Sequence, residues 1–174
     1  EGLVNWESTE KNIVKLNQHQ SYVTQGFIGS DENNFTVTLG REGSDYSAAI
    51  FAYCLSATDM TIWKDVPGVM TCDPRKFENV ELLSHISYEE AIEMAYYGAS
   101  VIHPKTLQPL KQKHIPFFVK SFVEPEKPGT KVGISDINEQ IESYILKENQ
   151  VLMRIATRDF SFIAEDHMSY IFAQ

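Results

Sequence analysis

Hydrophobic and polar residues alternate over the first part of the chain and then give way to a run of small and apolar side chains. Residues 21–29 and 35–39 alternate as strands do, and turn-forming residues fill positions 30–34 between them. This pattern predicts a β-hairpin. Residues 45–55 are small or apolar on every side, which a surface helix would not tolerate, so we expect a buried helix packed against a sheet. The segment 38–45 therefore joins a hairpin to a buried helix.

Strands and helices continue to alternate through the middle of the chain. Ser87 followed by Glu90 forms a capping box at a helix start, and Gly98 has the position of a C-cap. Pro104 suits the first turn of a second helix. The pattern as a whole adds helices at 8–16, 87–97 and 104–113 and strands at 60–63 and 115–120. This order is typical of an α/β fold, in which helices cover a sheet.

A change of composition marks a boundary near the last quarter of the chain. Residues 124–133 are rich in proline, glycine and charge, which indicates a loop. Beyond it the pattern predicts strands at 143–146 and 151–157 and a helix from about 161. We therefore divide the chain into a first unit, 1–135, and a second, 136–174. Because the chain starts at Glu1 and its last pattern has no stop signal at Gln174, we expect a piece of a longer protein.

Composition narrows the class of protein. The 174 residues are 43% hydrophobic, which favours a packed core, and the net charge of -9 gives no reason to expect nucleic acid or an anionic membrane. The longest apolar run, 48–55, is too short to span a bilayer. Cys54 and Cys72 match no metal or redox spacing and suit a reducing cytosol. We expect a cytoplasmic protein without a metal site of its own.

The loop between hairpin and buried helix holds the first candidate site. Gly40 and Gly43 let the backbone turn and approach a ligand closely. Ser44 or Asp45 can cap the following helix, whose free amides favour negative charge. Arg41 adds a planar fork suited to a carboxylate or a phosphate. These residues alone leave two interpretations open. One is a plain capped turn, and the other is an anion site in which Asp45 pairs with a cationic group of the ligand.

A second candidate site follows the strand at 60–63. Lys64 and Asp65 stand at its carboxyl end, before a turn at Pro67 and Gly68. In α/β folds this end of a strand is where ligands bind.

Three blocks of sequence resemble one enzyme family, the aspartokinases. Residues 40–46, G-R-E-G-S-D-Y, resemble the family signature G-R-G-G-S-D-[YT], with Glu42 where a third glycine is commoner. Residues 63–69 with 73–75, and residues 97–106, match two further blocks in the family's order. The resemblance implies the three-layer α/β sandwich of the amino-acid kinase fold, of which the chain holds the C-terminal half. The start of an α+β ACT-like regulatory module follows it.

The resemblance also implies an activity. Members of the family transfer a phosphoryl group from ATP, with Mg²⁺, to the side-chain carboxylate of L-aspartate, giving 4-phospho-L-aspartate for lysine, threonine and methionine biosynthesis. We expect an amino-acid feedback effector and a homo-oligomer formed through the regulatory region. Lysine or threonine as effector, and a monofunctional or homoserine dehydrogenase-fused parent, stay open. The family's K-F-G-G motif with its catalytic lysine is absent, so the chain alone is expected to be inactive.

Residue roles follow from the matched positions. Arg41, Ser44 and Asp45 match positions that contact aspartate, with Arg41 on the α-carboxylate. Asp45 pairs with the substrate ammonium or organises catalytic lysines, and it is our candidate catalytic residue. The implied ATP-binding residues are Lys64, Asp65, Met70, Arg75 and Lys105.

At three matched positions this sequence differs from the residue that is common in the family. Lys64 stands where threonine is common, Met70 where tyrosine is common, and Ser100 where a phosphate-binding lysine is common. We expect Lys64 or Lys105 to supply the missing cation.

Two other classes remain as alternatives. One is a module that binds nucleotide or an amino-acid effector without catalysis. The other is an amino-acid kinase of different substrate, such as glutamate, acetylglutamate or a nucleoside monophosphate.

Overall fold

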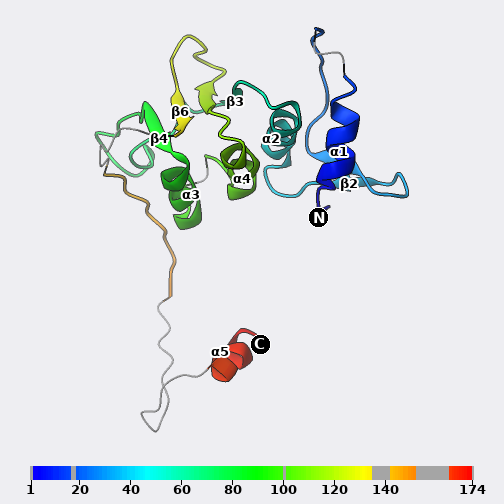
Figure 1. Ribbon diagram of the computed structural model, residues 1–174. Coiled ribbons are helices and arrows are strands. Elements are labelled where there is room, and N and C mark those ends of the chain that lie inside the picture. The colour runs from blue at the N-terminus through cyan, green and yellow to red at the C-terminus, as the bar shows by residue number, and fades with distance from the viewer. Residues whose placement is uncertain (1, 17–18, 100, 135–141, 152–164, 174) are drawn as a thin grey trace.

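The computed structural model describes residues 2–16, 19–99, 101–134, 142–151 and 165–173 (Figure 1). The helices are α1 (Trp6–Ile13), α2 (Gly43–Leu55), α3 (Tyr88–Tyr97), α4 (Pro104–Gln112) and α5 (Glu165–Phe172). The strands are β1 (Ile28–Ser30), β2 (Thr36–Thr38), β3 (Met60–Lys64), β4 (His85–Ser87), β5 (Phe117–Ser121) and β6 (Thr130–Gly133). Among the described residues no helix is both long and apolar enough to cross a membrane.

The fold is built around a mixed β-sheet. Its strand order is β3-β5-β6-β4, with β3 parallel to β5, β5 antiparallel to β6, and β6 parallel to β4. Ile62 pairs with Val119 in register, and Phe117 pairs with Val132. All four of these side chains are buried, because alternate residues of a strand point to the same face. The expected α/β fold is confirmed.

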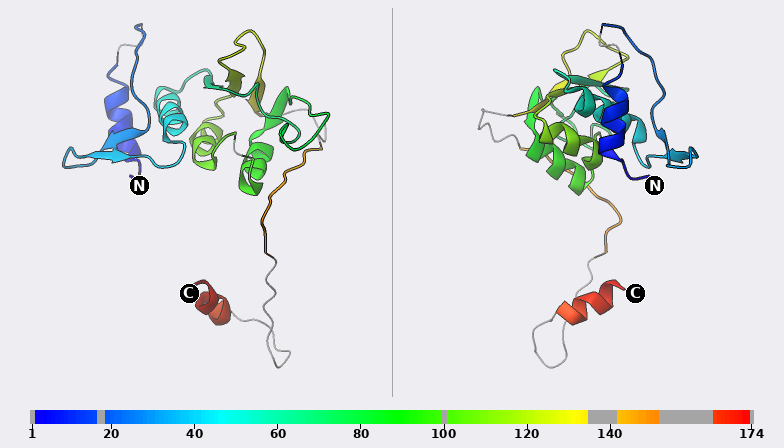
Figure 2. Two further views of the ribbon diagram at one scale, coloured as in Figure 1. Left: turned by 180° about the vertical axis from the view of Figure 1, so that it is seen from behind. Right: turned by 45° about the vertical axis from the view of Figure 1, so that its right-hand side comes forward.

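Three helices cover the apolar face of this sheet. Figures 1 and 2 show α3 and α4 side by side beneath the strands, and α2 packs against α4 and β3. The core pairs from these helices are Ala49 and Ala52 of α2, Ala91 and Met94 of α3, and Leu107 and Leu110 of α4. Within the described residues, sheet and helices make two of the three layers that the amino-acid kinase fold would have.

The helices α2 and α4 run in the same direction. Behind the end of α4, Nζ of Lys113 donates to the carbonyl oxygen of Tyr53 at 2.7 Å and to Oγ of Ser56 at 3.2 Å, at the end of α2. The carbonyl of Tyr53, which accepts from the amide of Ser56 at 3.1 Å, thereby gains a second donor at the end of α2. Because the two carboxyl ends meet here and the helices pack against each other, their amino ends point to the same side.

Local signals at α3 and α4 are confirmed. Ser87 and Glu90 form both bonds of the capping box, Gly98 ends α3 in a left-handed conformation, and His103 caps α4 before Pro104. Each of these signals depends on side chains within four positions of one another.

The side chain of Tyr88 ties the start of α3 to the strand layer. Its hydroxyl donates to the carbonyl oxygen of Ile115 at 2.5 Å. Burial raises the pKa of Tyr88 to about 12, and the charge of Glu89 adds to the shift. The phenol therefore stays protonated at neutral pH and keeps its donor role.

The predicted strands were partly wrong. Residues 21–27 form no strand, because Phe27 has φ 75° and its amide donates to Oγ of Ser47 instead of to a neighbouring strand. The predicted loop 124–133 contains β6, and β4 went unpredicted. Residues 143–146 are irregular rather than extended in a sheet, and 152–157 lie outside the described residues.

Candidate functional site

The loop before α2 is fixed by close packing. A Cβ on Gly43 would lie 2.8 Å from Cδ2 of Phe27 and 3.2 Å from Cβ of Leu39, so only glycine fits at this contact. Oγ of Ser47 accepts from the amide of Phe27 and donates to the carbonyl oxygen of Gly43, both at 2.9 Å. The chain before β1 is thereby held against the first turn of α2.

The predicted caps of α2 were wrong. The helix begins at Gly43, so Ser44 and Asp45 lie inside its first turn, and the N-cap is Glu42, whose side chain makes no capping bond. The packing of Gly43 starts the helix earlier than the capping pattern predicted. Asp45 is therefore not an N-cap, and its side chain lies toward the neighbouring strand.

Glu42 carries backbone strain that a glycine would remove. Its φ of 54° lies in the left-handed region, and its Oε2 is buried without a hydrogen-bond partner among the described residues. We expect Glu42→Gly to raise the free energy of unfolding by about 0.5 to 1 kcal/mol, since left-handed strain of about 1 to 2 kcal/mol outweighs the extra freedom of an unfolded glycine. Urea denaturation measures the change.

Glu78→Gly is the matched control, because Glu78 is exposed and does not have a positive φ. It is expected to leave stability unchanged or slightly lower. A loss of stability in Glu42→Gly would mean that the glutamate makes contacts worth more than its strain.

An ion pair between α2 and β3 is the centre of the site. Nζ of Lys64 lies 2.8 Å from Oδ2 of Asp45, and the two side chains are only 21% and 16% exposed. Lys64 therefore pairs with Asp45 and not with the adjacent Asp65, which is exposed. Partial burial reduces solvent screening, so this contact is stronger than a surface ion pair. Asp45 holds the lysine ammonium at the carboxyl end of β3.

The amino end of α4 brings a second lysine to the same edge. The backbone amide of Lys105 donates to Nδ1 of His103 at 3.2 Å. Burial raises the pKa of Tyr46, and the positive charge of Lys105 partly offsets that shift, which places Lys105 near the first turn of α2. The amino end of α4 thus lies near the first turn of α2, and Lys64 at the carboxyl end of β3 contacts that same turn through Asp45. Such an arrangement favours a bound anion.

Other predicted residues lie around this centre or apart from it. Arg41 and Ser44 are exposed on the loop and first turn of α2. Arg75 donates through Nε and Nη2 to the carboxylate of Asp73, at 3.0 and 2.9 Å, and these bonds lower the pKa of Asp73. Met70 pairs with Leu82 in an isolated bridge.

Of the predicted set, the structure therefore pairs Asp45 with Lys64 and places Lys105 near Tyr46 of the same helix turn. Ser100 lies outside the described residues, and the role of Arg75 at a phosphate stays a prediction. Sequence reasoning did not find the pairing of Asp45 with Lys64. One signal was present, since a residue at a helix start and one at the end of the following strand meet at the same edge of an α/β layer.

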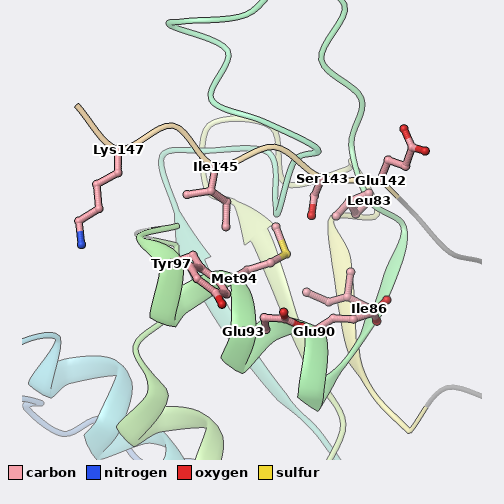
Figure 3. Close-up of a pocket in the computed structure, with 10 residues that line it drawn as sticks. All are labelled: Leu83, Ile86, Glu90, Glu93, Met94, Tyr97, Glu142, Ser143, Ile145 and Lys147. Atoms are coloured by element: carbon pink, nitrogen blue, oxygen red, sulfur yellow. The ribbon is translucent and has the colours of Figure 1, made fainter. Parts of the chain in front are cut away.

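A cavity of about 680 Å³ opens elsewhere, between α3 and residues 142–147 (Figure 3). Leu83, Ile86 and Met94 form its apolar floor, while Glu93 stands at its rim. It contains none of the predicted site residues. The candidate site is therefore the open edge at Asp45 and not this cavity.

Comparison with known proteins agrees with this arrangement. Residues 4–121 match the model of the amino acid kinase family. The chain is 44% identical over 134 residues to the lysine-sensitive aspartokinase 3 of Escherichia coli, covering 76% of the chain and 30% of that protein. It is 43% identical over 139 residues to a bifunctional aspartokinase/homoserine dehydrogenase of Buchnera aphidicola, covering 79% of the chain and 17% of the relative.

Solved structures show the same likeness. Aspartate kinase of Clostridium acetobutylicum matches with a TM-score of 0.72 and 33% identity over 79% of the chain and 32% of that protein. Aspartokinase III of E. coli, in complex with aspartate and ADP, matches with a TM-score of 0.62 and 47% identity over 66% of the chain and 26% of that protein. The chain thus spans less than a third of the length of these relatives.

Proposed function

Because the chain belongs to the amino acid kinase family, we propose that it is part of an ATP-dependent aspartate kinase, which phosphorylates the side-chain carboxylate of L-aspartate. The observation that carries the proposal is the half-buried pair of Asp45 and Lys64, which joins the first turn of α2 to the carboxyl end of β3. The E. coli relative that binds aspartate and ADP supports the choice of substrates.

Phosphoryl transfer needs positioning and spread positive charge more than covalent catalysis. Lys64 and Lys105 supply positive charge beside the amino ends of α2 and α4, where a phosphate would be stabilised. Asp45 holds the ammonium of Lys64 in place through their ion pair. Arg41, on the exposed loop, binds the α-carboxylate of aspartate through its planar fork, and Ser44 adds a hydroxyl donor.

Nucleotide contacts extend along the loop that follows β3. Asp65, Met70 and Arg75 are the proposed ATP-binding residues there, with Arg75 leaving Asp73 to reach a phosphate. The described residues contain no group of three or more His, Cys, Asp or Glu side chains that could hold a metal ion. The proposal takes Mg²⁺ to enter with ATP, held largely by phosphate oxygens, where it would neutralise their charge.

The remaining proposals concern the protein as a whole. Residues 1–135 form the C-terminal half of a kinase domain, and residues 136–174 begin an ACT-like regulatory module. An amino-acid effector is supported by E. coli aspartokinase III, which was solved in complex with lysine and aspartate. A homo-oligomer built through that module is part of the same proposal. The free thiols Cys54 and Cys72 fit a cytoplasmic location.

A full-length protein carrying this sequence tests the function directly. We expect aspartate-dependent release of ADP from ATP, with the acyl phosphate trapped by hydroxylamine as a hydroxamate. Equal or faster turnover with glutamate, acetylglutamate or a nucleoside monophosphate would contradict the proposal.

Arg41→Ala in the same protein is expected to raise the aspartate KM about thirtyfold, equivalent to about 2 kcal/mol, because a charge-assisted bidentate contact is lost. Arg41→Lys should rescue little, since lysine lacks the planar fork. The ATP KM and the exposed control Lys127→Ala should stay unchanged. A normal aspartate KM in both Arg41 variants would remove Arg41 from the site.

A further inference from the structure

Residues 142–151, which we call the exit segment, pass α3 and then lead away from the body of the protein (Figures 1 and 3). Ile145 is half-buried and packs against the main core, and Figure 3 shows its side chain directed toward Met94 and Tyr97 of α3. The next residue, Leu146, is 53% exposed. Ile145 therefore anchors the exit segment to the core.

The exit segment also contacts the loop between β3 and β4. The backbone amide of Tyr144 donates to the carbonyl oxygen of Thr71 at 2.7 Å. Nζ of Lys76 lies 2.9 Å from Oε2 and 3.0 Å from Oε1 of Glu148. These two contacts lie on either side of the turn 73–75.

Few other contacts of the described residues fix the turn 73–75. Its base is closed, since the amide of Thr71 donates to the carbonyl oxygen of Glu81 at 3.0 Å and the amide of Glu81 donates to Oγ1 of Thr71 at 3.1 Å. Beyond the base, residues 74–79 are exposed, and within the described part of the chain Arg75 bonds to Asp73 of its own turn. A segment with few buried contacts opens easily unless another element holds it.

Resting on the proposed function, we infer that the exit segment positions the nucleotide loop. Ile145 fixes the segment to the core, and the segment then holds the loop at Thr71 and at Lys76. Displacing the exit segment frees the turn 73–75 and weakens ATP binding, while the aspartate site at α2 is unaffected. By linkage, nucleotide bound to the loop strengthens the hold on the exit segment to the same extent.

Amide hydrogen exchange in the 174-residue chain tests the contact without any activity. Ile145→Asp puts a charge into the half-buried contact, and we expect the amides of Thr71, Lys76 and Phe77 to exchange about tenfold faster. Leu146→Asp is the matched control and should leave these rates unchanged, since that side chain is exposed. Unchanged exchange in Ile145→Asp would overturn the inference.

A second variant guards against general unfolding in Ile145→Asp, which faster exchange in β5 and β6 would reveal. Glu148→Gln removes only the exposed ion pair with Lys76, and it is expected to speed exchange at Lys76 and Phe77 about twofold to threefold. The inference is overturned if two results occur together: the amides of β5 and β6 exchange faster in Ile145→Asp, and Glu148→Gln leaves the exchange rates of Lys76 and Phe77 unchanged.

Kinetics of the full-length kinase separates this inference from the proposed function. We expect Ile145→Asp to raise the ATP KM threefold or more, with kcat and the aspartate KM retained. Faster loop exchange with an unchanged ATP KM would uphold the positioning of the loop but overturn its nucleotide role. If Ile145→Asp leaves the exchange of the loop amides unchanged while Arg41→Ala still raises the aspartate KM, only the positioning role is overturned.

Discussion

Replacing Asp45 by asparagine is expected to lower kcat of the full-length kinase by about a hundredfold or more, equivalent to about 2.7 kcal/mol. Asparagine keeps the size of the side chain but loses the charge that holds Nζ of Lys64 at 2.8 Å. Because both side chains are mostly buried, the lysine would then be left without its counter-charge. Steady-state kinetics with trapped acyl phosphate measures the loss.

Lys64→Met in the same protein is expected to lower kcat/KM for ATP by about tenfold or more, and the double variant should cost less than the sum of the two single losses. Ser100→Lys should partly restore Lys64→Met, if a cation at either position serves the same phosphate. Lys120→Met is the matched control, since Lys120 lies on the neighbouring strand over the Trp63 ring. Additive losses would show that Asp45 and Lys64 act separately, and normal ATP kinetics in Lys64→Met would leave Lys105 as the remaining candidate cation.

Gly129→Ala is expected to lower the free energy of unfolding by about 3 kcal/mol, the sum of left-handed strain and overpacking. Gly129 has φ 73°, and an added Cβ would lie 2.2 Å from the carbonyl oxygen of Val119 on β5. The turn into β6 would have to open, although Thr130 beside it is wholly buried and its Oγ1 accepts from the amide of Val69 at 2.8 Å and donates to the carbonyl oxygen of Leu83 at 2.6 Å. Thermal unfolding followed by circular dichroism should show Tm lower by about 6 to 12 °C.

Gly29→Ala serves as its control. In the exposed hairpin an added Cβ would meet Cγ2 of Val37 only at 3.8 Å, an ordinary contact. Tm should therefore change little. If both alanine variants unfold at the temperature of the parent chain, the turn before β6 is looser than its packing implies.

Much of the candidate site could be read from the sequence. The strand end at Lys64 and the loop at Arg41 were found from turn and helix patterns, and the family from three blocks of residues. What the patterns missed was the partner of each charge. Lys64 was assigned to a phosphate of ATP, whereas it pairs with Asp45 across two elements.

The sequence by itself determined the elements whose signals are local. The capping box at Ser87, the C-cap at Gly98 and the helix start at Pro104 were confirmed, because each involves groups within one turn of helix. The apolar run of α2 likewise predicted its burial.

Only the tertiary structure decided which segments became strands and where the charges met. Residues 130–133, predicted as part of a loop, became β6 because β4 and β5 lie on either side to pair with them, whereas 143–146, predicted as a strand, pair with no strand among the described residues. The helix start at Gly43 was set by Phe27 and Leu39, which freed Asp45 to reach Lys64. A ladder or an ion pair depends on a partner many positions away, and no pattern within a few residues specifies that distance.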